Sequence, residues 1–192
     1  LARRREDGVS FSIHRVIQEI LRQQQIKNGA LVGLQTALDW IHSRVAISAT
    51  DPRSWNILTP IIPHAHCIGT FAHFHAILTP TARVLNQVAL YFKTKARFNE
   101  SAALYEKVLA IDAKTAGPAS LEYANSLNNY GQLLETIGKS REAEGAMRHA
   151  LSILESNPQA RSEELAGILG NYGRLLQSAG RFPEAEEKLR RA

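Results

Sequence analysis

The sequence contains a segment that recurs with a period of 42 residues. The hexapeptide 129–134 (NYGQLL) returns as 171–176 (NYGRLL), and 138–144 (GKSREAE) matches 180–186 (GRFPEAE) at the same offset. A recurring unit of this length cannot bury its apolar face alone and has to stack on copies of itself. Stacked units form a solenoid with a long concave surface, which favours a binding function over a catalytic one.

Composition places the chain among ordinary globular proteins. Of its 192 residues, 44% are hydrophobic and 21% are charged, which is enough apolar material for a buried core. The one cysteine, Cys67, rules out an internal disulfide and suits a reducing compartment. No uninterrupted apolar stretch approaches the roughly 20 residues of a membrane span. We therefore expect a cytoplasmic protein, and the start at Leu1 rather than Met predicts a piece of a longer chain.

The N-terminal residues predict a small β-hairpin followed by a helix. Asp7-Gly8 is a turn pair, and the residues after it alternate between apolar side chains and serine up to Ile13. From there the apolar period becomes helical until Lys27–Gly29, which suits a left-handed helix cap. The apolar stripe of this predicted helix consists of Ile13, Val16, Ile17, Ile20 and Leu21.

A short basic run at the N-terminus contributes to the net charge of +5. It consists of Arg3, Arg4 and Arg5. Such a run is most often a solvated edge, but it keeps nucleic-acid binding as a less favoured alternative function.

The middle of the chain predicts helices that lack the 42-residue echo. Apolar residues at 31, 34, 38, 41 and 45 put one face of a helix inward. Asp51 before Pro52 is a predicted N-cap for a short helix through Leu58. Pro60 and Pro63 are expected to interrupt the chain before a second helix of roughly 15 residues, whose apolar stripe carries Ile68, Phe71 and Phe74.

From Pro80 onward the copies can be aligned in phase. Small residues align in the predicted second helix of each pair at Ser101, Ala143 and Ala185, and larger ones at Tyr105, Met147 and Leu189. This alternation lets two antiparallel helices approach closely. Gly138 and Gly180 are expected to end first helices, and Asn99 and Ser140 to cap second helices.

The aligned positions resemble the tetratricopeptide repeat in its 42-residue form, known from kinesin light chains and from signalling NTPases of the STAND class. The resemblance covers residues 80–192 and implies helix–turn–helix units. The first copy departs from the pattern at Ala89, Ala96 and Ser101, and the third stops at Ala192. The residues that carry the pattern are Leu127, Tyr130, Gly131, Leu134, Gly138, Ala143, Met147 and Ala150.

Two upstream segments resemble the STAND proteins more specifically. Residues 11–18 (FSIHRVIQ) resemble the end of the winged-helix module behind an NB-ARC nucleotide-binding domain. Trp55 and residues 62–65 (IPHA) resemble the segment that links this module to the repeats. The resemblance implies a nucleotide-binding domain upstream. The chain itself has no Gly-x-x-x-x-Gly-Lys-Ser/Thr loop, so we expect this part to bind no ATP.

Metal binding and catalysis are both disfavoured. His64, His66, Cys67, His73 and His75 lie close in sequence, but no pair has the i, i+4 spacing that places two imidazoles on one ion. Helical phase predicts that His64, Cys67 and His75 lie on the buried stripe, where a thiol packs rather than reacts, and that His66 and His73 face outward. The acidic residues 142, 144, 184, 186 and 187 are most simply solvated. We therefore predict no enzyme, no cofactor and no metal.

The concave groove is where we expect a ligand. The resemblance implies that first helices line this groove, and that an asparagine at the position of Asn129 and Asn171 holds a bound peptide backbone; hydrogen bonding within the repeat is the alternative. Gly167 and Gly170 would suit close approach of a ligand or a neighbouring helix, or drift in a tolerant solenoid. The full set of predicted groove residues is Asn86, Leu90, Lys93, Asn125, Asn128, Asn129, Gln132, Glu135, Asn171, Arg174 and Gln177.

The sequence thus predicts an all-α solenoid in three parts: the remnant of a winged-helix module (1–28), a helical linker (29–79) and the repeat array (80–192). The expected function is a non-catalytic sensor that binds a protein or peptide and relays binding to an upstream STAND NTPase domain. A free-standing adaptor or scaffold is the alternative. We expect no membrane contact, and self-association through apolar surface around Leu189 at the end of the third copy.

Overall fold

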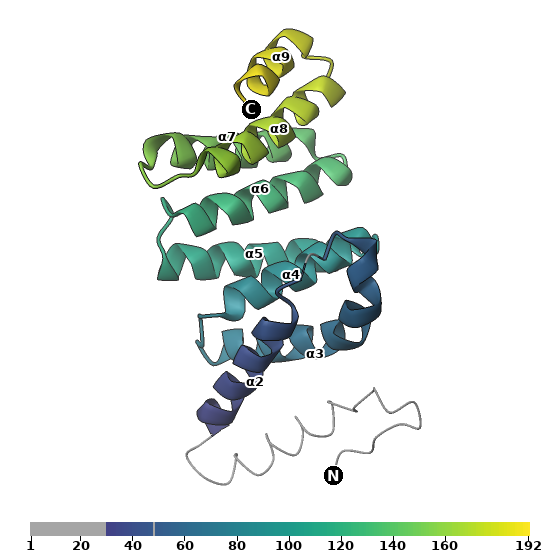
Figure 1. The fold of residues 1–192 in the computed structure, drawn as a ribbon, viewed down its shortest axis with the longest axis vertical. Coiled ribbons are helices and arrows are strands. Elements are labelled where there is room, and N and C mark those ends of the chain that lie inside the picture. Colours follow the sequence, from purple (N-terminus) through teal and green to yellow (C-terminus); the bar gives the residue numbers. More distant parts are fainter. Residues whose placement is uncertain (1–29, 48) are drawn as a thin grey trace. The chain divides into compact units, whose positions relative to one another are not determined.

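The computed structural model describes residues 30–47 and 49–192, which form eight α-helices and one 3₁₀ turn without a strand (Figure 1). The predicted β-hairpin and the helix after it lie outside the described residues. The elements are α2 (Ala30–Arg44), η1 (Pro52–Ser54), α3 (Trp55–Phe74), α4 (Thr81–Thr94), α5 (Phe98–Thr115), α6 (Leu121–Thr136), α7 (Ser140–Ser156), α8 (Ser162–Ser178) and α9 (Phe182–Arg191).

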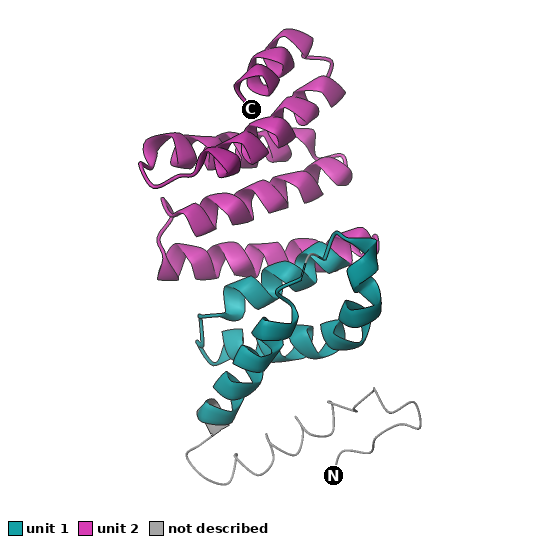
Figure 2. Ribbon diagram, in the orientation of Figure 1, with its two compact units in different colours: residues 1–91 teal, residues 92–192 magenta. Residues whose placement is uncertain are grey.

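The chain divides into two compact units, residues 1–91 and 92–192 (Figure 2). In the first unit α2 packs on α3 through the stripe that the sequence predicted, with Leu34, Leu38 and Ile41 buried. Asp51 caps η1 as expected, because its carboxylate accepts a hydrogen bond from the Arg53 N–H. The Trp55 indole N–H donates to the Ala49 carbonyl at 3.0 Å and fixes the corner between α2 and α3.

The prediction that Pro60 and Pro63 interrupt the chain was wrong, because α3 runs unbroken through both. Each proline removes one i→i−4 hydrogen bond, which leaves the carbonyls of Asn56 and Thr59 without their helical donor. Both prolines and both of these residues are exposed, so water can satisfy the two carbonyls. The opposite face is held by its packing, since Leu58, Ile62, Ala65 and Ile68 are all buried.

In the second unit the helices pair as the 42-residue period predicted. The second helix α7 packs against α6, α9 packs against α8, and consecutive pairs join through α5 with α6 and through α7 with α8. The close approach within a pair occurs at a glycine. A Cβ at Gly131 would lie 2.9 Å from Met147 Cγ, and one at Gly173 would lie 2.7 Å from Leu189 Cγ. The aligned glycine and large side chain are therefore one packing contact that occurs in both pairs.

First helices end in the same left-handed cap, as predicted. At Gly138, where φ is +80°, the Lys139 N–H donates to the Leu134 carbonyl at 2.8 Å and the Gly138 N–H to the Glu135 carbonyl at 3.0 Å. Gly180 closes α8 in the same way. Ala96 closes α4 with the same pair of bonds and a φ of +57°. The first copy has thus lost the glycine but kept the turn.

The predicted caps of the second helices were wrong by a residue or more. The N-cap positions of α5, α7 and α9 are Arg97, Lys139 and Arg181, and none of these side chains caps the helix. Their backbone dihedrals agree within a few degrees, so the left-handed cap of the preceding helix sets the entry to the next one. The short turn leaves no place for a separate serine or asparagine cap.

Candidate binding surface

Six of the predicted groove residues form a connected polar surface in the second unit, which we call the polar seam. It runs from the last turn of α4 across α6 to α8, two first helices that contact each other directly. Lys93 Nζ donates to Gln132 Oε1 at 3.1 Å, and Asn171 Nδ2 donates to Asn128 Oδ1 at 3.0 Å. Arg174 in turn donates to Asn171 Oδ1. The six residues are Lys93, Asn128, Gln132, Glu135, Asn171 and Arg174.

The charges of the seam are close enough to influence one another. Desolvation by the surrounding protein lowers the pKa of Lys93, the Arg174 guanidinium lowers it further, and the Glu135 carboxylate raises it. The seam thus holds two cations and one anion beside uncharged amides. Such a surface can offer donors and acceptors to a peptide backbone and a charge to its side chains.

The other five predicted groove residues differ in their exposure. Asn125 and Gln177 are exposed, and Asn129 is half-buried beside Asn128. Asn86 and Leu90 are half-buried in the first unit. The amide that the sequence singled out at 171 bonds across to Asn128 of the preceding repeat, so its contact joins two repeats and does not stay within one.

Gly167 and Gly170 leave part of the surface of α8 without side chains. A Cβ at Gly167 or Gly170 would meet no atom within 4 Å. Close approach of a neighbouring helix, one of the predicted reasons for these glycines, is therefore absent among the described residues. Ligand approach and tolerated drift remain as explanations, whereas Gly131 and Gly173 have a packing reason.

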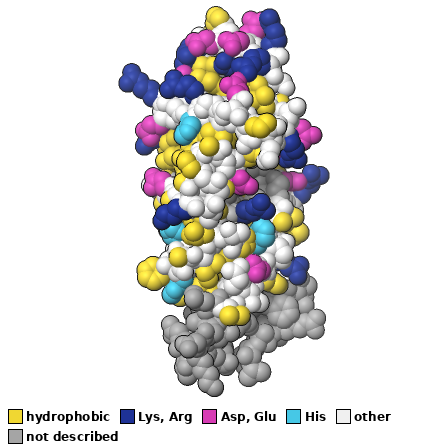
Figure 3. Space-filling model, turned by 90° about the vertical axis from the view of Figure 1, so that its left-hand side faces the viewer, with side chains coloured by type: hydrophobic (Ala, Val, Ile, Leu, Met, Phe, Trp, Pro, Cys, Tyr) yellow, Lys and Arg dark blue, Asp and Glu magenta, His cyan; other side chains and the backbone are white. Residues whose placement is uncertain are grey.

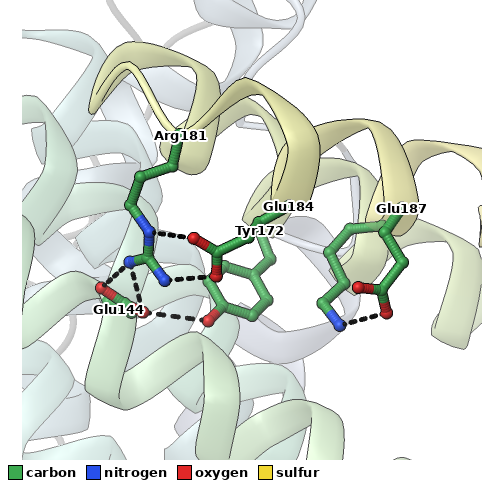
Figure 4. Close-up of polar contacts among 6 residues, drawn as sticks. Glu144, Tyr172, Arg181, Glu184 and Glu187 are labelled. Carbon is green, nitrogen blue, oxygen red and sulfur yellow. Dashed lines mark hydrogen bonds and ion pairs between the residues drawn. The ribbon is translucent and has the colours of Figure 1, made fainter.

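A second polar cluster fixes α8, and thereby the seam residues on it, against its neighbours (Figure 4). The Tyr172 hydroxyl donates to Glu144 Oε1 of α7 at 3.1 Å. Arg181 Nη1 contacts both oxygens of Glu144 at 2.8 Å, and Arg181 also binds Glu184 of α9. These bonds lower the pKa of the Glu144 carboxyl, with the Arg181 guanidinium as the first cause. Since Tyr172 follows Asn171, its bond to α7 sets the rotation of α8.

Sequence reasoning missed this cluster, although the period held a signal for it. A basic residue followed by glutamate three positions later recurs at 97/100, 139/142 and 181/184, and each pair is an ion pair in the structure. Glu142 and Glu184 are about half exposed in first turns, as predicted for solvated carboxylates. The prediction was wrong for Glu144, which is less exposed and bonded to Tyr172 and Arg181. On the face drawn in Figure 3, basic and acidic side chains lie side by side over much of the repeat region. One period before Tyr172, burial raises the pKa of the Tyr130 hydroxyl and the nearby Glu106 carboxylate of α5 raises it further, so the tyrosine of the earlier copy also has a glutamate of the preceding helix as its neighbour.

The cysteine and two of the histidines of α3 differ from their predicted places. Cys67 is exposed and not packed in the core. His75 is exposed too, with its ring edge-on to Phe71 at 4.4 Å and to Phe74 at 5.2 Å. His73, which was predicted to face outward, is half-buried, as is His64. The buried stripe of α3 passes through Ala65, Ile68 and Ala72, which leaves Cys67 on the exposed side of the helix.

Three further features of the described residues bear on the site. A hollow on α9, lined by Pro183, Glu186, Glu187, Arg190 and Arg191, takes in none of the predicted groove residues. Across residues 30–47 and 49–192, no group of three or more histidine, cysteine or acidic side chains is arranged to hold a metal ion. Within the same ranges, no helix combines the length and apolarity that crossing a membrane requires.

Comparison with known proteins agrees with this geometry. The tetratricopeptide repeat family matches residues 80–156. The structure of BtubC (BKLC) from P. vanneervenii superposes with a TM-score of 0.66 at 18% identity, over 94% of this chain and 86% of that one. Kinesin-light-chain TPR-like repeats of Podosopora anserina superpose with a TM-score of 0.59 at 19% identity, over 94% and 93% of the two chains. No curated protein matches the sequence.

The matched residues span α4 to α7, and α8 with α9 repeats the same packing and capping one period later. At identities below 20%, the two structures support the fold alone. Residues 80–156 are therefore a tetratricopeptide repeat region, within a chain whose described residues form an all-helical, tetratricopeptide-like solenoid.

Proposed function

We propose that this chain is a protein-interaction module that binds a protein or peptide segment on the polar seam. Tetratricopeptide repeats generally act as non-catalytic scaffolds for protein partners, and BtubC and the kinesin-light-chain repeats share the fold. The observation that carries the proposal is the continuity of the seam. Amide and charged side chains from α4, α6 and α8 join into one surface through contacts between repeats.

The seam suits an extended segment with exposed backbone groups. Asn128 and Asn171 each carry a donor and an acceptor, so they can exchange their mutual bond for bonds to a peptide unit. Gly167 and Gly170 leave room beside them, since no atom lies where their side chains would be. On binding, Asn171 would exchange its hydrogen bond to Asn128 for one to the peptide backbone, so its present hydrogen bond does not prevent binding.

A displayed library of short peptides tests the proposal. Peptides that bind the wild-type chain are measured again with the double variant Asn128→Ala/Asn171→Ala, which removes both amides of the bond that joins α6 to α8 in the seam. We expect binding to weaken at least about tenfold, because two bidentate amides are lost, while the melting temperature changes little. A large fall in melting temperature instead would mean that the two asparagines are structural.

The matched control removes two asparagines away from the seam. Asn56 on α3 and Asn99 on α5 are both exposed, so Asn56→Ala/Asn99→Ala makes the same chemical change elsewhere. Peptides that bind at the seam keep their affinity for this control. Peptides whose affinity falls equally in both double variants would place the binding surface elsewhere.

The finer part of the proposal is that binding is relayed to an upstream STAND NTPase domain. It rests on the resemblance of residues 11–18, and of Trp55 with residues 62–65, to the junction between winged helix and repeats. Trp55 holds the corner between α2 and α3, which suits a residue at a junction. A free-standing adaptor is the alternative, and it needs nothing upstream.

The longer reading frame decides between the relay and the adaptor. A phosphate-binding loop upstream of Leu1 supports the relay, and its absence leaves the adaptor. Where the loop exists, a peptide from the library should change the ATP hydrolysis rate of the full polypeptide. It should not change that rate in the Asn128→Ala/Asn171→Ala variant.

A further inference from the structure

Lys93 and Arg174 are the two cations of the polar seam, and neither has an ion pair with a described residue. Lys93 Nζ donates to the uncharged Gln132, and the Arg174 guanidinium donates to the uncharged Asn171. The basic side chains at 97, 139, 161 and 181 of the same unit each pair with a glutamate instead. The two seam cations are therefore satisfied as hydrogen-bond donors but not as charges.

The two cations lie close enough to repel each other. Lys93 reaches Gln132 of α6, and α6 packs directly on α8, where Arg174 occupies the repeat position of Gln132 one period later. Desolvation lowers the pKa of Lys93, and the Arg174 guanidinium lowers it further. One anion bound beside both cations would offset their repulsion, because it attracts each of them.

Burial distinguishes Lys93 from other cations of the unit. Lys114 of α5 and Arg141 of α7 also have no ion pair with a described residue, but both are exposed, so water and salt screen their charges. Lys93 is half-buried, and the fold has already removed part of its hydration. A carboxylate beside Lys93 is therefore attracted more strongly than one beside an exposed lysine.

We propose that the polar seam selects peptide segments with an aspartate or glutamate side chain, whose carboxylate binds to Lys93 and Arg174 together. This inference rests on the proposed function and adds the chemistry of the ligand. On binding, the carboxylate accepts hydrogen bonds from Lys93 Nζ and from the Arg174 guanidinium, which leave their amide acceptors. The released oxygens of Gln132 and Asn171 then accept from backbone N–H groups of the segment.

Glu135 limits the negative charge that the seam accepts. Its carboxylate interacts with Lys93, but it forms no ion pair with a described residue. It repels an incoming anion while the two cations attract it, so the seam carries one net positive charge. We therefore expect selection for a single acidic side chain, and removal of the Glu135 charge should strengthen its binding.

Matched peptides test the charge that the seam selects. Peptides from the displayed library that lose affinity in Asn128→Ala/Asn171→Ala are made with blocked termini, so that only their side chains carry charge. Each acidic side chain is then replaced by its amide, aspartate by asparagine or glutamate by glutamine. We expect one such replacement to weaken binding to the wild-type chain at least about tenfold at low salt, and less at high salt.

Variants of the seam assign this effect to its residues. In Lys93→Gln/Arg174→Gln the acidic peptide should lose its advantage over the amide form, whereas Glu135→Gln should increase that advantage. Both new glutamines fit the repeat, because other copies carry Gln177 and Gln132 at the same positions. The opposite signs expected from the two variants keep the test decisive even if one of them lowers the melting temperature.

The matched control removes the same amount of charge away from the seam. Lys114 and Arg141 are both exposed, so Lys114→Gln/Arg141→Gln should keep the full advantage of the acidic peptide. An equal loss in this control and in Lys93→Gln/Arg174→Gln would show that only the overall charge of the chain matters, and it would overturn the inference.

The outcomes distinguish this inference from the proposed function. If no library peptide lost affinity in Asn128→Ala/Asn171→Ala, the proposed function itself would be contradicted, and the inference with it. If peptides bound at the seam but the acidic and amide forms bound equally well, the proposed function would stand and the inference alone would be overturned. An acidic advantage that persisted in Lys93→Gln/Arg174→Gln would overturn it in the same way.

Discussion

The helices α3 and α7 both bury one apolar face, but the side chains on their outer faces differ in kind. The outer face of α7 carries Arg141, Glu142 and Arg148 and exposes no large apolar side chain, whereas α3 contains no Asp, Glu, Lys or Arg and exposes Ile57, Phe71 and Phe74. Six of the eight large apolar side chains exposed among the described residues lie in the first unit. The exposed faces of the repeat helices are therefore polar, whereas the α2–α3 region exposes apolar side chains that are suited to further contacts.

This difference shows that a sequence period reveals only the contacts that recur between copies of one unit. In the second unit each pair packs against a copy of itself, so the same contacts recur and the residues that make them return every 42 positions. The α2–α3 region packs against elements that are not copies. Its residues are constrained just as strongly, as the contact between Gly69 and Leu85 shows, but by neighbours that differ from helix to helix.

The largest expected effect tests the glycine contact of the repeats. Met147→Ala removes a fully buried side chain and should lower the free energy of unfolding by about 2–5 kcal/mol. Adding Gly131→Ala should recover part of this loss, because the new methyl group fills the space that Met147 Cγ leaves, 2.9 Å away. Chemical denaturation of the two single variants and the double variant measures the coupling.

The first unit supplies the matched case. A Cβ at Gly69 would lie 2.7 Å from Leu85 Cδ2, so Leu85→Ala with Gly69→Ala should show a rescue of the same sign. Gly131→Ala alone should destabilise the protein. Additive effects at 131 and 147 would refute the contact on which the repeat alignment rests.

The next expected effect is a change in stability at the left-handed helix caps, and its sign differs between the first copy and the later ones. Ala96 adopts a φ of +57° where the later repeats have Gly138 and Gly180, so Ala96→Gly should stabilise the protein by about 1 kcal/mol. Gly138→Ala should destabilise it by a similar amount. Ala76, at the end of α3, has a φ of +56° and should respond as Ala96 does. Thermal melts of the three variants measure the effect, and a loss of stability in Ala96→Gly would contradict the assignment.

These positions also show how far the sequence could predict the fold. The period located the helix pairs, their caps at Gly138 and Gly180, and the close contacts at Gly131 and Gly173, because each recurs with the unit. Pro60 and Pro63 misled the prediction, since local propensity disfavours proline inside a helix and tertiary packing overrode it. Cys67 was misplaced because the prediction took Phe71 and Phe74 for the buried face of the helix, whereas the buried stripe passes through Ala65, Ile68 and Ala72.

The sequence could predict which helices carry the residues of the candidate site, but not the hydrogen bonds that join these residues. Phasing placed Asn128, Gln132 and Asn171 on first helices, and the structure joins them into the polar seam. It could not show that Asn171 bonds to the preceding repeat, because the rotation of α8 depends on contacts such as the one between Tyr172 and Glu144. A single sequence shows the members of such a cluster only when they recur.

A smaller expected effect is the pH dependence of stability, which distinguishes an ion pair between helices from an ion pair within one turn. The folded protein holds the pKa of the Glu144 carboxyl below its ordinary value of 4.5, mainly through Arg181. Its ionised form therefore stabilises the fold above pH 4.5, and this contribution is lost as the pH falls through the folded pKa. Glu144→Gln should lower the melting temperature at neutral pH, and the difference from the wild type should close in acid.

The comparison with the first unit is Asp51→Asn. The pKa of Asp51 is also lowered, but by Arg53 within the same turn. Because this pair joins no two helices, its loss should change the melting temperature less than that of Glu144→Gln does. Equal effects of the two variants would mean that the ties between α7, α8 and α9 add nothing beyond a local pair.

The smallest expected effect compares the same repeat position in two copies. Glu142 meets Lys139 Nζ at 3.3 Å, whereas Glu184 meets two nitrogens of Arg181, a planar fork that also holds Glu144. Both glutamates are about half exposed, so water and salt weaken either pair. Glu184→Gln should lower the melting temperature slightly more than Glu142→Gln at low salt, and the difference should disappear at high salt. If Glu142→Gln were as costly, the contact of both Arg181 nitrogens with Glu184 would add nothing beyond the single contact that Lys139 makes with Glu142.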